Sequence, residues 1–487
     1  MVRSVLPIIV FSYLLLICPV DLNGQLEAWD SDQDAMPNAW EYHRGLDEEN
    51  PRDAWLDPDQ DGVCNLYEYY LGSNPQDPDQ PVVLDYTGNQ SLETFIRVAP
   101  RGAVLRIPEG EYILNYRHEA YAEPPRVLIQ GGWKADFSER DHCRYKTVLN
   151  GTGKNPVFHY LISYGNSSSL ILDGFILQGG KGEAIQYTSY LSKAQLLIAN
   201  STLMGNEASR TSAVVKYVDG DFTLISDVIL INSVIAHNAG TGLLISQQAN
   251  LSNLKVLHSL IAYNDAATSD SEPIESGYGM VYSPGADSLV HVQMANSILW
   301  GNALADVWFD DPDRKRVRVN SRYNVYGYIE RDSLSAPFAH QSDTGLDPLV
   351  LHRGEQYFLG PNSPARGSGQ SIGFSEEEHP DAGIVSCGDP LVSTPSQPVK
   401  KASDCRVYPN PAQSGLAFEL NLIAPGIVYI VFFDQTGRQV LHKSMGYLSS
   451  GPQSFKVDIS HLPSNSYWLE VRSGGQLLNR PFKLIKR

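Results

Sequence analysis

Asn200-Ser201-Thr202-Leu203-Met204-Gly205-Asn206 (NSTLMGN) is the clearest repeated phrase in this chain. It returns as NSVIAHN at Asn232–Asn238, as HSLIAYN at His258–Asn264 and as NSILWGN at Asn296–Asn302. The loops between these copies differ in length. A short unit of this kind cannot bury its own apolar face, so successive copies must stack on one another. The sequence therefore predicts an all-β, stacked architecture.

Each copy predicts one short strand with alternating side chains, followed by a turn that carries an asparagine. We expect these asparagines to adopt the left-handed turn conformation and to hydrogen bond to their counterparts in the neighbouring coil. The four ladder positions are Asn206, Asn238, Asn264 and Asn302. Coils stacked in this way form a parallel β-helix with a spacing of about 4.8 Å.

Residues 82–372 resemble the right-handed parallel β-helix proteins with a pectin-lyase-like fold, and we expect this domain to span residues 82–388. The motifs that carry the resemblance are RIPEGEYIL, IQGGWKADFSERD, LDGFILQGG, NSILWGN and DPLV…YFLGPNSPARGSG. The last motif resembles a terminal coil, with Arg366 where an aspartate is usual. Ser91–Ala99 predicts a short amphipathic helix with a serine N-cap, placed to cover the first coil.

Two acidic segments precede this region. Each places oxygen-bearing side chains at loop positions 1, 3, 5, 9 and 12, with a backbone carbonyl at position 7, which is the spacing of an EF-hand-type calcium loop. The predicted calcium ligands of the first loop are Asp30, Asp32, Asp34, Met36, Asn38 and Glu41. Those of the second loop are Asp57, Asp59, Asp61, Val63, Asn65 and Glu68.

The second loop has Gly62 at the sharp turn, whereas the first has Ala35 at the equivalent position. Together the loops resemble thrombospondin type 3-like repeats, which implies a calcium-binding module over residues 25–80. The alternative is a solvated acidic linker, which would be disordered because its carboxylates repel one another.

Residues 404–487 predict a small β-sandwich of short alternating strands, preceded by a linker at 389–403. VYPNP, DISHLPSNSYWLEV and the closing FKLIKR resemble the C-terminal sorting domain of type IX secretion cargo. The resemblance implies recognition by the type IX secretion machinery and a secreted or outer-membrane surface location.

The N-terminus agrees with export. Arg3 and the apolar run at 5–17 predict a signal peptide over residues 1–24, while Cys18 leaves a lipoprotein site as an alternative. No later segment is apolar enough to span a membrane. Removal of the signal leaves Cys64, Cys143, Cys387 and Cys405, whose disulfide pairing the sequence leaves open.

The formal net charge is −18, and fifteen acidic residues lie between Glu27 and Asp79, so nucleic acid is not expected as a partner. Five aromatic residues of the late coils are candidates for stacking on sugar rings, although they are equally suited to packing loops onto the coils. These candidates are Tyr263, Tyr278, Tyr282, Trp300 and Trp308.

The catalytic motifs of polygalacturonases and pectate lyases are absent from the sequence. This favours a calcium-binding, non-catalytic glycan-binding or adhesion protein at the cell surface. Two alternatives remain open: a polysaccharide lyase or glycoside hydrolase acting on an acidic polysaccharide, and a mainly structural surface protein stiffened by calcium.

Overall fold

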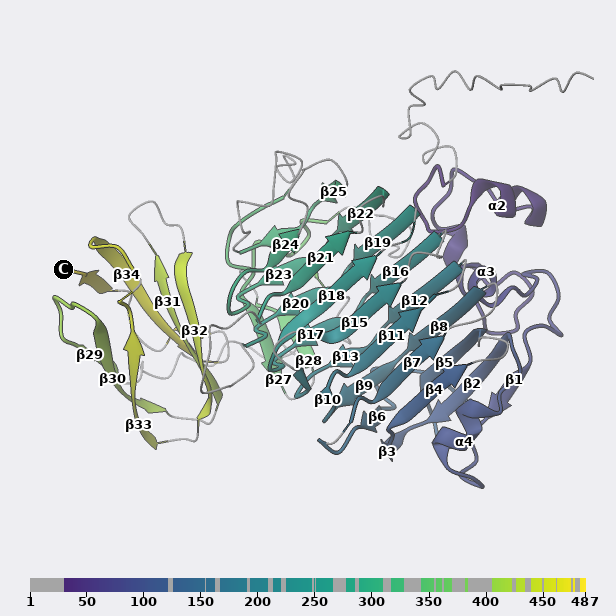
Figure 1. The fold of residues 1–487 in the computed structure, drawn as a ribbon, viewed down its shortest axis with the longest axis horizontal. Coiled ribbons are helices and arrows are strands. Elements are labelled where there is room, and N and C mark those ends of the chain that lie inside the picture. The colour runs from purple at the N-terminus through teal and green to yellow at the C-terminus, as the bar shows by residue number, and fades with distance from the viewer. Residues whose placement is uncertain are drawn as a thin grey trace, which may run out of the picture.

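The structure is a computed structural model (Figure 1). It describes residues 30–487, except 121–125, 154, 163–166, 191–192, 209–212, 220–224, 248, 250, 266–276, 285–288, 310–316, 328–342, 354–355, 361–362, 370–381, 384–404, 423–425, 434–438, 449–450, 461, 474–475 and 478–481. The predicted signal peptide at 1–24 and the predicted linker at 389–403 lie outside the described residues.

Over the described residues, three parallel sheets run along a rod (Figure 1). The first sheet contains β1 (Val83–Asp85), β2 (Ala103–Pro108), β5 (Arg126–Trp133), β8 (Ser167–Asp173), β12 (Lys193–Ala199), β16 (Ile225–Ile231), β19 (Leu251–Leu257), β22 (Leu289–Ala295) and β25 (Val317–Arg322). The second contains β3 (Gly110–Ile113), β6 (Thr147–Asn150), β9 (Phe175–Gln178), β13 (Thr202–Leu203), β17 (Val234–Ala236), β20 (Leu260–Ala262), β23 (Ile298–Trp300) and β26 (Val325–Tyr326). The third contains β4 (Tyr116–Ala120), β7 (Phe158–Ile162), β11 (Ile185–Ser189), β15 (Ala213–Asp219), β18 (Thr241–Gln247), β21 (Met280–Pro284) and β24 (Val307–Phe309).

The chain visits the three sheets in turn, and each strand pairs with the equivalent strand of the next coil, as β13 pairs with both β9 and β17. This arrangement is a parallel β-helix, which confirms the predicted fold class. One further parallel pair, β10 (Lys181–Gly182) and β14 (Glu207–Ala208), lies between the second and third sheets in sequence.

The predicted asparagine ladder is present and buried. Asn206 Nδ2 donates to Asn238 Oδ1 at 3.0 Å, and Asn238 repeats the contact with Asn264 at 3.0 Å. Asn264 donates to Asn302 at 2.9 Å, and Asn302 closes the row on Asp306 Oδ1 at 2.7 Å. Because each amide bonds to the next coil, the ladder fixes the register of the stack.

The left-handed turns lie one residue away from where the sequence placed them. Positive φ occurs at the first residue of each copy and at the residue before each ladder asparagine, not at the ladder asparagine itself. The residues concerned are Asn200, Asn232, His258, Asn296, Gly205, His237, Tyr263 and Gly301. The ladder asparagines themselves have no positive φ, and their amides bond from coil to coil.

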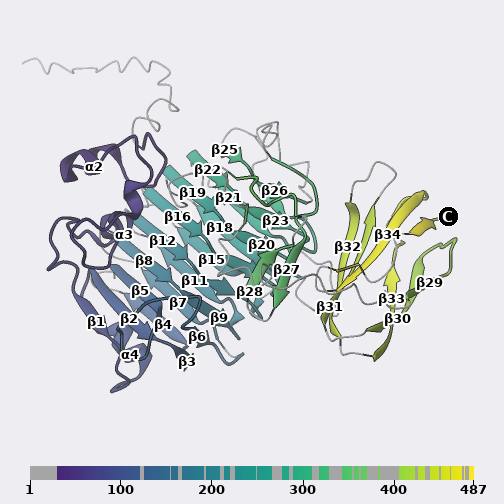
Figure 2. The same cartoon turned by 180° about the vertical axis from the view of Figure 1, so that it is seen from behind.

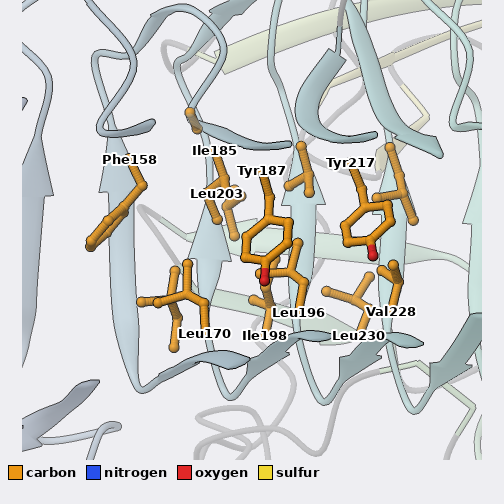
Figure 3. Close-up of a cluster of buried hydrophobic side chains, with 14 of the residues drawn as sticks. Phe158, Leu170, Ile185, Tyr187, Leu196, Ile198, Leu203, Tyr217, Val228 and Leu230 are labelled. Carbon is orange, nitrogen blue, oxygen red and sulfur yellow. The ribbon is translucent and has the colours of Figure 1, made fainter. Parts of the chain in front are cut away.

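Both faces of the first sheet are buried. In β12, Leu196 and Ile198 face the interior of the rod, whereas Leu197 belongs to a second apolar cluster outside it. The interior also holds a row of tyrosines from the third sheet, with the ring centroids of Tyr187 and Tyr217 at 5.3 Å (Figure 3). A sheet covered on both sides is what its unbroken apolar runs require.

Helix α4 (Leu92–Arg97) covers the first coil, with Thr94 N donating to the N-cap Ser91 Oγ at 3.2 Å. The predicted terminal coil is wrong in one respect. Its residues form an antiparallel hairpin, β27 (Val350–Arg353) and β28 (Gln356–Leu359), which packs on the outer face of the second sheet beside β20 and β23 (Figure 2). It thus covers that face instead of extending the stack.

The C-terminal strands are antiparallel and enclose a core of their own. They are β29 (Cys405–Tyr408), β30 (Gly415–Leu422), β31 (Gly426–Phe433), β32 (Gln439–Leu448), β33 (Gly451–Asp458), β34 (Ser466–Ser473), β35 (Gln476–Leu477) and β36 (Phe482–Ile485).

Asn238→Ala should lower the free energy of unfolding by about 3 kcal/mol, because it leaves the buried backbone N–H of Asn206 without its acceptor and removes one acceptor of the Asn206 amide. Chemical denaturation of the secreted chain measures this. Asn89→Ala, at an exposed position, is the control and should change stability by less than about 0.5 kcal/mol. Equal effects of the two substitutions would contradict the ladder's structural role.

Candidate metal centre

The two acidic loops have the same backbone geometry. In the first loop, Asp30 Oδ2 accepts from Ala35 N at 3.2 Å and Asp34 Oδ1 accepts from Met36 N at 2.7 Å. The second loop repeats these contacts at the equivalent positions, from Gly62 N to Asp57 Oδ2 at 2.8 Å and from Val63 N to Asp61 Oδ1 at 2.7 Å.

Ala35 adopts the conformation that its position requires. Its φ is 81°, close to the 90° of Gly62 in the second loop. Gln33 and Gln60, two residues earlier, also match, with φ of 66° and 64°. The substitution of glycine by alanine in the first loop therefore leaves its shape unchanged, although a left-handed alanine costs about 1 kcal/mol.

Most aspartates of the two loops cap a backbone N–H with one oxygen and leave the other, inner oxygen buried; Asp57 differs, because both of its oxygens accept backbone N–H groups. These inner oxygens are buried and have no protein hydrogen-bond partner: Oδ2 of Asp32, Asp34, Asp59 and Asp61, Oδ1 of Asp30, and both oxygens of Glu41 and Glu68. Glu41 and Glu68 are fully buried. A buried carboxylate without a partner is unfavourable by several kcal/mol, so these groups must either take up protons or lie against a cation.

The raised pKa values of the loop carboxyl groups reflect the same unfavourable burial of charge. Burial raises the pKa of Asp34 to about 9, with the charges of Asp30 and Asp32 adding to the effect. Burial likewise raises the pKa of Glu41 and of Glu68 to about 8. Without a cation, these carboxyl groups would hold protons at neutral pH instead of charge.

The carboxylate of Asp53, which the loop spacing did not predict, lies beside the ligands of the first loop. Asp53, in the short 3₁₀ helix η1 (Asp53–Trp55), joins Asp32, Asp34 and Glu41 in a cluster whose donor oxygens all lie within 4.8 Å of one another. Asp53 is buried, and its Oδ1 has no partner. Asp57, Asp59 and Asp61 form the equivalent cluster of the second loop.

The two predicted asparagine ligands differ in their contacts. Asn38, in α2 (Asn38–Arg44), bonds through its amide to Ser31, with Ser31 N donating to Oδ1 at 2.8 Å. Asn65, at the start of α3 (Asn65–Leu71), donates to the backbone oxygen of Asp53 at 2.7 Å, while its own Oδ1 is buried without a partner. Asn65 therefore links the second loop to the backbone of Asp53.

The N-terminal module, defined as residues 30–80, packs on the outer face of the first sheet (Figures 1 and 2). Its apolar contacts reach from β2 to β22 through Met36, Leu66 and Tyr70. Lys255 Nζ, in β19, donates to Asp30 Oδ2 at 3.0 Å and to Gln33 O at 2.8 Å. Lys193 Nζ, in β12, donates to Tyr69 OH at 2.7 Å.

The five aromatic candidates for sugar stacking separate into two groups. Tyr282 is fully buried in the rod interior, and Trp300 is buried beneath the β27–β28 hairpin, so neither is open to a sugar ring. This corrects the sequence interpretation for these two residues. Tyr263 is half-buried and stacks on His237. Tyr278 and Trp308, from adjacent coils, are half-buried and stacked at 5.3 Å between centroids.

The structure gives the oxidation state of two of the cysteines, Cys64 and Cys143. Cys64 is a free thiol, and burial raises its pKa to about 12, which keeps it protonated. Cys143 is disulfide-bonded, and its partner lies outside the described side chains.

A family model described as the secretion system C-terminal sorting domain matches residues 406–486. No curated protein sequence matches the chain significantly. The matched domain identifies cargo of type IX secretion, so the chain is a secreted or cell-surface protein that engages the type IX secretion machinery. No helix among the described residues is long and apolar enough to cross a bilayer.

Asp53→Asn should weaken calcium binding at the first loop by at least about tenfold, because affinity in such sites follows the number of charged ligands. Calorimetric titration of the secreted chain with calcium chloride measures this. Asp79→Asn, an equivalent change at an exposed position of the same module, is the control and should leave the titration unchanged. Identical titrations of the two variants would exclude Asp53 from the site.

Proposed function

We propose that this chain is a calcium-binding protein of the cell surface or extracellular medium, and that it binds glycan without turning it over. The row of buried, partnerless carboxylate oxygens in the two loops carries the calcium part of the proposal. All of these donors are oxygens, and six to eight oxygen ligands are what calcium prefers.

Calcium is structural in this proposal. The loops that would hold it present Met36 and Asp30 to the outer face of the rod, where Met36 is buried and Asp30 pairs with Lys255. A cation that fixes the loops therefore also fixes the contact between the module and the coils. The pectin-lyase-like and thrombospondin type 3-like resemblances agree with such a division into shaft and calcium module.

The glycan part rests on the Tyr278–Trp308 pair. Val307 and Phe309 point into the rod, so alternation along β24 turns Trp308 outward. Stacked rings on the side of a β-helix offer a flat apolar surface that suits the face of a sugar ring.

A glycan array probed with the secreted chain tests this proposal. Binding should be found without release of reducing ends or unsaturated uronates, and Trp308→Ala should weaken it. Tyr190→Ala is the control, since Tyr190 is another exposed aromatic residue of the rod. Product release would favour the lyase or hydrolase alternative, and an array with no signal would leave only the structural role of the protein.

A further inference from the structure

A pocket of about 240 Å³ lies where the first acidic loop meets the late coils of the first sheet. We call it the junction pocket. One wall is the loop segment 31–34, which includes Asp32 and Asp34, and another is Trp55 of η1. The opposite side is built by β16, β19, β22 and β25. The pocket therefore exists only when the module is seated on the rod.

The pocket has an apolar floor and a polar rim. Ile231, Leu257 and Ala295 provide the floor, on the outer face of the first sheet. The rim carries the amides of Gln293 and Asn320 and the exposed guanidinium of Arg322.

The strand register aligns this rim. Gln293 pairs with Asn320 on the neighbouring coil, and Ala295 pairs with Arg322, so the two amides lie side by side and the guanidinium follows one step along. Asn320 Nδ2 also donates to Gln33 Oε1 at 3.2 Å, and Arg322 Nε donates to Asn320 Oδ1 at 3.1 Å. These contacts hold the rim against the acidic loop.

The hydrogen-bonding groups of the junction pocket determine which class of ligand it can bind. The guanidinium can only donate hydrogen bonds, whereas the amides both donate and accept them. Hydroxyl groups satisfy donors and acceptors together, whereas an anionic ligand would lie beside a loop whose carboxylates Asp30, Asp32, Asp34, Glu41 and Asp53 outnumber the charges of one calcium ion and Lys255. The apolar floor and Trp55 suit the C–H face of a ring, and the volume is below that of a drug-sized site.

From these observations we infer that the junction pocket holds one sugar residue of a neutral glycan. This inference rests on the proposed function, and it adds a second site on the outer face of the first sheet to the Tyr278–Trp308 pair. Because the wall at 31–34 belongs to the first acidic loop, sugar binding here depends on calcium.

The test uses the secreted chain and a set of neutral probes: the methyl glycosides of mannose, galactose and glucose, with glucuronate as an anionic comparator. Saturation-transfer NMR titrations are recorded in calcium and again in excess EDTA. At least one neutral glycoside should bind in calcium, lose its signal in EDTA, and bind more tightly than glucuronate.

Arg322→Ala should weaken that binding about tenfold, since it removes a charged hydrogen-bond donor from an exposed rim without disturbing the core. Arg144→Ala is the matched control, because its side chain is 67% exposed at the other end of the rod. A preference for glucuronate, or equal binding by both variants, overturns the pocket assignment. If Trp308→Ala alone abolishes binding, the inference is wrong and the proposed function stands. If none of the probes binds and the glycan array is silent, both the inference and the glycan part of the proposed function fail.

Discussion

The structure depends on negative charge that the N-terminal module buries without compensating it. Among the described loop residues, the inner oxygens of Asp32, Asp34 and Glu41 have no protein partner, and Lys255 pairs with Asp30 instead. Carboxyl groups buried in this way must be protonated or balanced by a cation in the folded state. The docking of the module, the shape of the junction pocket and the covering of the first sheet all follow from how that charge is balanced.

The N-terminal module packs on the rod, whose coils are joined by hydrogen bonds between buried side chains. Buried asparagine and serine side chains bond from coil to coil, with Ser201 N donating to Ser233 Oγ at 3.1 Å and Ser233 N to Ser259 Oγ at 3.2 Å. The N-terminal module runs opposite to the order of the coils, so that its earlier residues contact later coils. Tyr69 contacts Lys193, whereas the earlier Asp30 contacts the later Lys255. The first acidic loop can therefore dock only after most of the coils have formed.

The sequence predicted the β-helix, the ladder and the two acidic loops because each repeats at a fixed spacing. It missed Asp53, which lies outside both loops and reaches the first site only through the turn of η1. It also did not foresee that the amide of Asn38 bonds to Ser31, because loop spacing does not reveal local hydrogen bonds. One signal was available but unused: the unbroken apolar run Val228-Ile229-Leu230-Ile231 indicates a strand buried on both faces, and thus a partner for the outer one.

The aromatic residues proposed to bind glycan show a second limit of prediction from sequence. Alternation along a strand separates Trp308 from its buried neighbours, but only the fold shows that Trp300 lies beneath the β27–β28 hairpin. The junction pocket was equally beyond sequence reasoning, because its walls join residues as distant in the chain as Gln33 and Asn320.

Anomalous diffraction from crystals of the secreted chain grown in calcium tests the central claim most directly. The account predicts one ion in each acidic loop, with oxygens of Asp34, Glu41 and Asp53 in one and of Asp57, Asp59 and Asp61 in the other at about 2.3–2.6 Å. Loops without anomalous density in saturating calcium, with the module still seated on the rod, would contradict it.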